Sequence, residues 1–187
     1  MSDPLLRAGR LLVASPTMRD PNFERSVVLL LEYGDDGALG IVLNRPTDTD
    51  LYAAVPGGWE RLAAEPPVIF VGGPVAPAAA ICLARSPADY ETEGWTPLFG
   101  GLGTVDLNLD PDLLETPLQA VRVFAGYAGW APGQAEAEVD EGAWFVLDAL
   151  PGDALSTDPD DLWRSVLLRQ GGDLALLANF PDDPALN

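Results

Sequence analysis

Short apolar runs alternate with polar segments rich in glycine and proline along the first half of the chain. Residues 11–14 predict a buried strand that ends at Ser15-Pro16. Residues 26–33 and 38–43 are apolar runs around a Gly-Asp-Asp-Gly turn, which predicts a β-hairpin. Because both hairpin strands are apolar on both faces, we expect other layers to cover both sides of the sheet.

The rest of the chain continues the alternation of strands and helices. Further strands are expected at residues 68–71, 79–84, 104–109, 121–125 and 143–147, and helices at 47–55, 134–141 and 158–170. In the last helix Asp158 is the expected N-cap, Pro159 follows it, and Gly171-Gly172 ends the helix. The pattern predicts an α/β fold, a compact mixed β-sheet with helices on both faces in a three-layer, sandwich-like arrangement that starts with the hairpin.

The length favours one domain over residues 1–187. Residues 85–103, rich in Pro, Gly and Glu, are expected to form a long excursion, and residues 179–187 a loosely ordered tail. The N-terminus has no signal-peptide pattern, and no apolar run is long enough to span a bilayer. A single cysteine excludes an intramolecular disulfide, so we expect a cytoplasmic protein.

The charge is strongly acidic, with 29 acids, 10 bases and a net charge of −19. Every base is an arginine, and the second half of the chain carries most of the acids. The excess either solvates the surface or binds a basic partner. Direct nucleic-acid binding is not expected, because affinity for phosphate backbones depends on cationic contacts.

The residues that are absent exclude several kinds of chemistry. Without histidine and lysine the chain has no imidazole base, no Schiff base and no Walker-A lysine. With one cysteine and no histidine, a Cys/His zinc site is excluded, and the acidic groups lack calcium-loop spacing. Neither a metal nor a cofactor is therefore expected. Cys82 lies in an apolar run and is interpreted as a buried small side chain.

Arginines gather around the first hairpin. Arg19, Arg25 and Arg45 lie in or beside its flanking loops. Ser15, Asp20, Ser26 and Asn44 lie near them in sequence. If these loops converge, they form a cationic corner suited to a carboxylate or phosphate. The alternative is that each arginine pairs with a neighbouring acid such as Asp20 or Glu24.

Two further motifs leave alternatives open. Gly72-Gly73-Pro74 follows a strand, where its backbone either makes a tight turn or cradles an anion. In residues 126–134, Tyr127 and Trp130 precede a turn into the helix that carries Gln134 and Glu138. This motif either packs a strand tightly against a helix or lines a binding cleft with Tyr127, Trp130 and Gln134.

Several ordered motifs resemble the AlgH/YqgE family. They are Leu-Leu-Val-Ala-Ser-Pro at 11–16, Asp-Pro-Asn-Phe-Glu-Arg-Ser at 20–26, Gly-Ile-Val-Leu-Asn-Arg-Pro at 40–46, Val-Gly-Gly-Pro-Val at 71–75 and Gly-Tyr-Ala-Gly-Trp-Ala-Pro-Gly-Gln at 126–134. The resemblance covers residues 8–178 and implies a compact, cytoplasmic, bacterial α/β sandwich of a kind often described as a transcriptional regulator. One departure is Ala84, which stands where the family pattern places a histidine.

Three functions follow as hypotheses. The leading one is a non-enzymatic regulatory or binding module that acts through a protein or a small anionic ligand. The second is an enzyme that uses Asp, Glu, Ser or Arg chemistry on an anionic metabolite. Direct DNA binding is the third, and the charge and the lack of a recognition helix argue against it.

Overall fold

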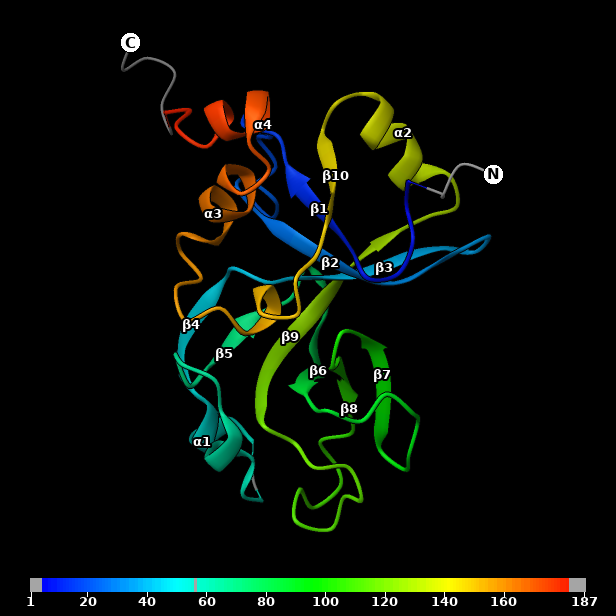
Figure 1. Ribbon diagram of the computed structural model, residues 1–187, viewed down its shortest axis with the longest axis vertical. Helices are drawn as coiled ribbons and strands as arrows, with labels where there is room; N and C mark the ends of the chain where they lie inside the picture. The colour runs from blue at the N-terminus through cyan, green and yellow to red at the C-terminus, as the bar shows by residue number, and fades with distance from the viewer. Residues whose placement is uncertain (1–4, 56, 182–187) are drawn as a thin grey trace.

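The computed structural model describes residues 5–55 and 57–181, and strands dominate the fold (Figure 1). The strands are β1 (Arg10–Ala14), β2 (Val27–Gly34), β3 (Gly37–Val42), β4 (Pro46–Asp50), β5 (Val68–Val71), β6 (Val75–Arg85), β7 (Trp95–Phe99), β8 (Leu102–Val105), β9 (Ala120–Trp130) and β10 (Trp144–Asp148). The helices are α1 (Leu51–Ala54), α2 (Gln134–Asp140), α3 (Leu162–Leu168) and α4 (Gly172–Leu177), with 3₁₀ turns η1 (Trp59–Leu62) and η2 (Asp153–Leu155).

The strands form one curled sheet, in the order β10-β1-β2-β3-β9-β6-β8-β7. Its neighbouring strands along this path are antiparallel. The long strand β9 joins the two halves, because it pairs with β3 near its end and with β6 along most of its length. β5 pairs with β9 in parallel and carries β4 beside it. Figure 1 shows β9 crossing the molecule between these groups.

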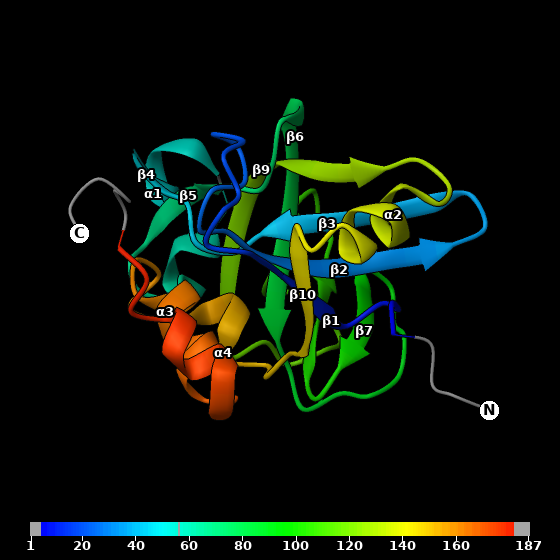
Figure 2. The same cartoon turned by 90° about the horizontal axis from the view of Figure 1, so that it is seen from above.

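The hydrophobic core forms on alternating residues of the first strands. Leu11 and Val13 of β1 belong to a cluster that contains Trp163 and Val166 of α3. Leu12 and Ala14 of β1 belong to a second cluster, which contains Ala135 of α2 together with Trp130 and Trp144. Figure 2 shows α2 near β2 and β3, and α3 and α4 on the other side of β10. A third cluster lies around Trp59, Trp95 and Val121, within the half that holds β6, β7 and β8.

The hairpin prediction is confirmed by β2 and β3, and the mixed, strand-containing fold is confirmed in general form. The three-layer sandwich with helices on both faces is not confirmed. The sheet curls into an antiparallel half-barrel, and its four helices, among the described residues, span only four to seven residues each. Helices this short cap the sheet locally and do not form continuous layers.

Some predicted boundaries are wrong. Residues 46–50 form β4 and only 51–54 are helical, with the Asp50 side chain accepting the N–H of Tyr52 at 2.7 Å. The strand expected at 104–109 ends at Val105. Asp161, not Asp158, occupies the N-cap of α3. The expected excursion contains β7, which extends the sheet. Gly171-Gly172 ends one helix, as predicted, but a further helix, α4, begins at Gly172. Most of the predicted tail, 182–187, lies outside the described residues.

Candidate functional site

Three loops that are distant in sequence meet around one hollow of about 260 Å³. They are the loop after β1, the β3–β4 connection and the β5–β6 connection. We call this space the proline hollow. Its lining residues are Pro21, Asn22, Val42, Arg45, Pro46, Val71, Gly73 and Pro74. Each loop carries one of the motifs of the family resemblance, so the hollow is built from the most recognisable parts of the sequence.

Backbone hydrogen bonds hold these loops in place. The N–H of Val71 donates to the carbonyl of Arg45, and the N–H of Val42 donates to the carbonyl of Gly72, both at 2.8 Å. Gly73 has a φ of +154°, and a Cβ there would lie 2.2 Å from the carbonyl carbon of Tyr127. The two adjacent glycines are therefore required by the close approach of this turn to β9.

Arg45 forms a wall shared by two hollows. Besides the proline hollow it lines a second space of about 240 Å³, the arginine hollow, whose lining residues are Arg25, Asn44, Arg45, Asp160, Asp161, Trp163, Arg164 and Ala178. The Arg45 guanidinium donates to the carbonyl of Glu24. Burial lowers the pKa of Arg45, and the nearby Glu24 carboxylate opposes that shift. The side chain is thus a partly desolvated cation, whose attraction for an anion exceeds that of a fully hydrated one.

Arg25 is fixed within the arginine hollow. Its backbone has a φ of +53°, and its guanidinium lies 4.3 Å from the centre of the Trp163 ring. It also donates to the carbonyl of Phe180 at 2.7 Å. Asn44 holds the adjacent backbone, since its amide donates to the Arg25 carbonyl and its oxygen accepts the N–H of Val27, each at 2.9 Å. The loop conformation, unusual for a non-glycine residue, is therefore supported from both sides.

The other residues predicted around the hairpin take local roles. Arg19 lies 3.7 Å from the Glu24 carboxylate, as the pairing alternative expects. Asp20 accepts the N–H of Asn22 at 2.9 Å. Ser15 is buried with its hydroxyl 3.1 Å from that of Thr17, and the hydroxyl of Ser26 is buried without a partner among the described residues. The structure thus brings Arg25, Asn44 and Arg45 to one hollow and leaves the others in the surrounding loop.

The Trp130 motif, residues 126–134, lines neither hollow, and its Trp130 lies in a packed aromatic cluster. Glu138 of α2 accepts the indole N–H of Trp130 at 2.9 Å and that of Trp144 at 2.8 Å, through the same oxygen. Its other oxygen accepts the amide of Gln134 at 2.9 Å. Phe23, from the loop of the proline hollow, packs against both indole rings. These contacts favour the strand-to-helix packing interpretation, and Tyr127 contributes its backbone to the contact with Gly73.

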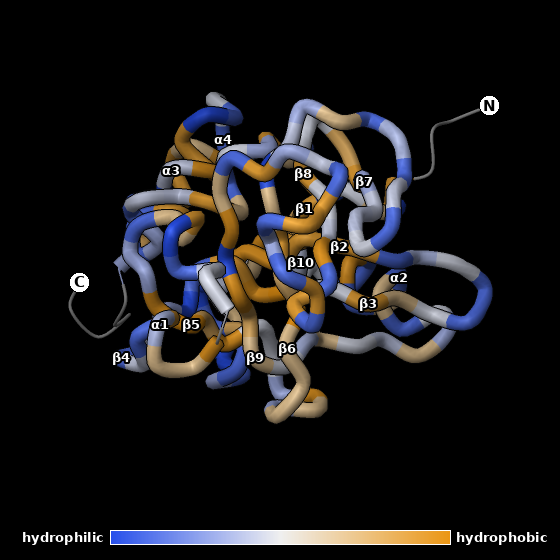
Figure 3. The backbone as a smooth tube through the Cα atoms, turned by 90° about the horizontal axis from the view of Figure 1, so that it is seen from below, coloured by the Kyte–Doolittle hydropathy of each residue, from blue (hydrophilic) through white to orange (hydrophobic). Residues whose placement is uncertain are grey.

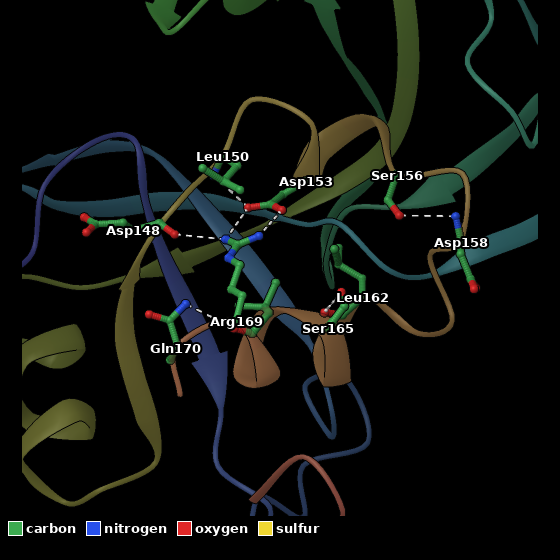
Figure 4. A network of polar contacts seen from close by, with 10 residues as sticks. Asp148, Leu150, Asp153, Ser156, Asp158, Leu162, Ser165, Arg169 and Gln170 are labelled. Atoms are coloured by element: carbon green, nitrogen blue, oxygen red, sulfur yellow. Dashed lines mark hydrogen bonds and ion pairs between the residues drawn. The ribbon is translucent and has the colours of Figure 1, made fainter. Parts of the chain in front are cut away.

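Sequence reasoning missed the buried Arg122 and the ion pair of Arg169 with the buried Asp153. Arg122 lies in β9 with 2% of its surface exposed, and its guanidinium donates to carbonyls of Glu65, Ala154 and Ser156. The sequence did contain a sign of this buried charge, because Arg122 is the one charged residue within the apolar run of 121–125. Arg169 at the end of α3 binds both oxygens of Asp153, at 2.6 and 2.7 Å, in the network of Figure 4. No local sequence pattern predicts the contact between Arg169 and Asp153, which lie 16 residues apart.

Cys82 is buried, as expected, and burial strongly raises the pKa of its thiol. Ala84 is also buried, on β6 between β8 and β9.

Within the described ranges, no three or more carboxylates or thiols are placed to hold a metal ion. The same ranges contain no helix with the length and hydropathy needed to cross a membrane.

Comparison with known proteins agrees with this architecture. The model of the AlgH-like family matches residues 11–175. The chain belongs to the AlgH-like family. It is 52% identical to a UPF0301 protein of Streptomyces coelicolor over 96% of this chain and 94% of the relative. A UPF0301 protein of Thermobifida fusca is 46% identical over 99% of this chain and 98% of its own length.

Two solved structures share the AlgH-like fold of this chain. A crystal structure of a Corynebacterium diphtheriae protein has a TM-score of 0.88 at 31% identity, covering 96% of this chain and 95% of that one. The solution structure of AlgH from Pseudomonas aeruginosa has a TM-score of 0.68 at 29% identity, covering 97% of both chains. The half-barrel, including the paired hollows around Arg45, is therefore built on an AlgH-like framework.

Proposed function

We propose that this AlgH-like chain is a non-enzymatic, cytoplasmic binding module that takes a small anion with an apolar body into the proline hollow. The observation that carries the proposal is the convergence of three separate motifs on Arg45. Arg45 is the one charged side chain among the lining residues of this hollow. Around it lie prolines and valines, so the lining suits one carboxylate or phosphoryl group attached to an apolar group.

The two hollows differ in their suitability for an anion. The arginine hollow places Asp160 and Asp161 beside its three arginines, so the charges there largely offset one another. Its Arg164 lies 3.8 Å from the Asp161 carboxylate. The proline hollow has no acidic lining residue and adds the Asn22 side chain as a hydrogen-bonding group. Its volume of about 260 Å³ suits a small metabolite better than a nucleotide or a peptide.

A regulatory role follows from how the hollow is joined to the rest of the molecule. The loop that supplies Pro21 and Asn22 also carries Phe23, which packs on the indole rings of Trp130 and Trp144, and Arg25, which packs on Trp163. A ligand that reorders this loop would change two hydrophobic clusters and the surfaces they support. Any effect on transcription would then proceed through a protein partner, since the net charge of −19 opposes direct DNA binding.

The test is a panel of aliphatic and aromatic carboxylates and their phosphorylated counterparts, assayed by thermal shift and then by titration calorimetry. We expect a member of the panel to raise the melting temperature of the native chain but not that of Arg45→Gln. Arg61→Gln is the matched control, because Arg61 makes an exposed ion pair with Asp112 outside the hollow. The fold of each variant is checked by circular dichroism.

Three results would overturn the proposal in different ways. If no anion stabilises the chain, or if Arg45→Gln retains full ligand binding, the proline hollow is not the site. If a bound anion is chemically converted during the titration, the enzymatic alternative replaces the binding module.

A further inference from the structure

A second surface, formed mostly by residues 80–115, has several hollows whose charged lining residues are all acidic. Three hollows of about 290, 540 and 480 Å³ share lining residues and so lie next to one another. The first and second share Leu109 and Asp110, and the second and third share Ala80, Leu107 and Asn108. We call the combined feature the acidic groove. In Figure 1 its strands β6 and β8 and the loop that follows them lie in the lower half of the molecule.

The charges along the acidic groove are all of one sign. Five exposed carboxylate residues line it and no arginine does: Glu32, Glu93, Asp106, Asp110 and Glu115. The proline hollow presents the opposite arrangement, with Arg45 as its one charged lining residue. Because these carboxylates lie on a concave surface that also holds apolar side chains, their combined potential is focused into the groove.

The groove also offers apolar surface to a partner. Leu113 is 80% exposed at one end, and Leu107, Leu109 and Leu114 are half-buried in the walls. Figure 3 shows that apolar and polar segments alternate over this part of the chain. An exposed leucine beside partly buried ones is suited to receive an apolar side chain. Solvation of acidic residues alone does not account for that apolar lining.

Arg61 shows how a guanidinium binds at the rim of the groove. Its Nη2 donates to both oxygens of Asp112, at 2.8 and 2.9 Å, one residue before Leu113. The Asp112 carboxylate raises the pKa of Arg61. A second guanidinium would find similar carboxylates at Asp110 and Glu115, on either side of this pair.

We propose that the acidic groove binds a short basic segment of a partner protein, in which arginine or lysine residues are interspersed with apolar ones. The basic residues would bind the carboxylates, and the apolar residues would enter the leucine-lined hollows. This proposal concerns a different surface from the proline hollow and stands or fails independently of it.

The experiment measures fluorescence anisotropy of a short labelled peptide of alternating arginine and leucine with the full chain. The groove variant is Glu93→Gln, Asp110→Asn and Glu115→Gln together. These changes keep the side-chain shapes, and the amide oxygen at position 110 can still accept the N–H of Asp112. We expect the dissociation constant of the peptide to rise at least about tenfold.

A matched control separates the groove from the general attraction of a chain with net charge −19. Asp35→Asn, Asp36→Asn and Glu141→Gln remove the same charge from exposed positions outside the groove. We expect this control to weaken binding by less than about twofold. Leu113→Ser, at an exposed position, should weaken the arginine–leucine peptide but not an arginine–serine peptide.

Each contrary outcome overturns the proposal. Equal losses in the two triple variants would show non-specific attraction to the acidic surface. An unchanged affinity in Leu113→Ser would remove the apolar component. If the peptide does not bind and the chain instead forms dimers that the groove variant dissociates, the groove receives a second copy of this chain and not a basic segment.

Discussion

Arg122 is expected to hold three segments of the chain together, and Arg122→Met tests this directly. The guanidinium donates to the carbonyls of Glu65 at 2.5 Å, Ser156 at 2.8 Å and Ala154 at 3.3 Å. It also lies 4.3 Å from the centre of the Phe70 ring. The side chain thus connects β9 to the segment before β5 and to the turn η2. Methionine keeps the apolar stem and removes every donor.

The magnitude follows from the groups that lose their partners. A buried carbonyl without a donor costs about 1–3 kcal/mol, and the two shortest bonds involve Glu65 and Ser156. Part of this cost is offset because the variant no longer buries a charge. That burial lowers the pKa of Arg122 to about 10, so the side chain is still protonated at neutral pH. We therefore expect a loss of about 3 kcal/mol in the free energy of unfolding.

The assay is urea denaturation followed by tryptophan fluorescence and circular dichroism, with thermal denaturation as a second measurement. For a chain of this length, 3 kcal/mol corresponds to a decrease of about 6–12 °C in melting temperature. Arg122→Lys should recover less than half of the loss, because one ammonium cannot reach carbonyls on both segments as the guanidinium does. Arg61→Met, which breaks an exposed ion pair, should leave the denaturation midpoint nearly unchanged.

Two results would refute this reasoning. If Arg122→Met is as stable as the native chain, the three carbonyl contacts contribute nothing net. If Arg122→Lys restores full stability, a positive charge at this position is sufficient and the planar geometry of the guanidinium is not required.

Three further predictions concern the other polar contacts. Glu138→Gln should cost about 1–2 kcal/mol and change the tryptophan emission, because a neutral amide oxygen is a weaker acceptor than the carboxylate for the two indole N–H groups, and the new NH2 group would face the Gln134 amide, which is also a donor. Asp153→Asn should cost about 2 kcal/mol in urea denaturation, because the Asp153 side chain is only 7% exposed and loses its ion pair with Arg169. In Tyr33→Phe, the pKa of Glu136 measured by carboxyl NMR should rise, because the Tyr33 hydroxyl donates to that carboxylate at 2.5 Å and lowers its pKa.

The last of these has a definite pH dependence. Because the pKa of Glu136 is lowered in the folded state, the stabilisation is present above the ordinary glutamate range and is lost as the pH falls through the folded-state value. The stability difference between native and Tyr33→Phe should therefore shrink on acidification. A difference that grows in acid would contradict the prediction. Unchanged stability in Glu138→Gln or Asp153→Asn would likewise show that those contacts are dispensable.

Local signals in the sequence were sufficient for the hairpin and insufficient for β4. The Gly-Asp-Asp-Gly turn between two apolar runs specifies the β2–β3 hairpin within one short segment. In contrast, Thr47 and Asp48 resemble helix caps, yet Thr47 donates to the carbonyl of Ile69 and its segment pairs with β5. That pairing depends on a strand about twenty residues away, so tertiary contacts outweigh the local preference.

Part of the candidate site could likewise be predicted from local sequence, and part of it could not. Arg25, Asn44 and Arg45 flank one hairpin, so their convergence was predictable from the topology of that hairpin. Trp163 reaches them from α3, with its indole donating to the carbonyl of Ala14 at 2.8 Å. A contact between residues 149 positions apart has no local pattern to reveal it. The Gly72-Gly73 turn was visible as a motif, but its position against β9 required the structure.

The fold places the arginine-rich and the acid-rich parts of the chain at two different surfaces. Residues 20–46 and 71–74 supply the proline hollow, where a cation lies among apolar groups, while residues from β6 onward supply most of the acidic groove. A net charge of −19 alone would favour basic partners at any point of the surface. Because Arg45 is partly desolvated and its hollow has no acidic lining residue, that site can still favour an anion. In the two proposals, selectivity therefore arises from the local surroundings of each charge, and the proline hollow and the acidic groove bind ligands of opposite sign.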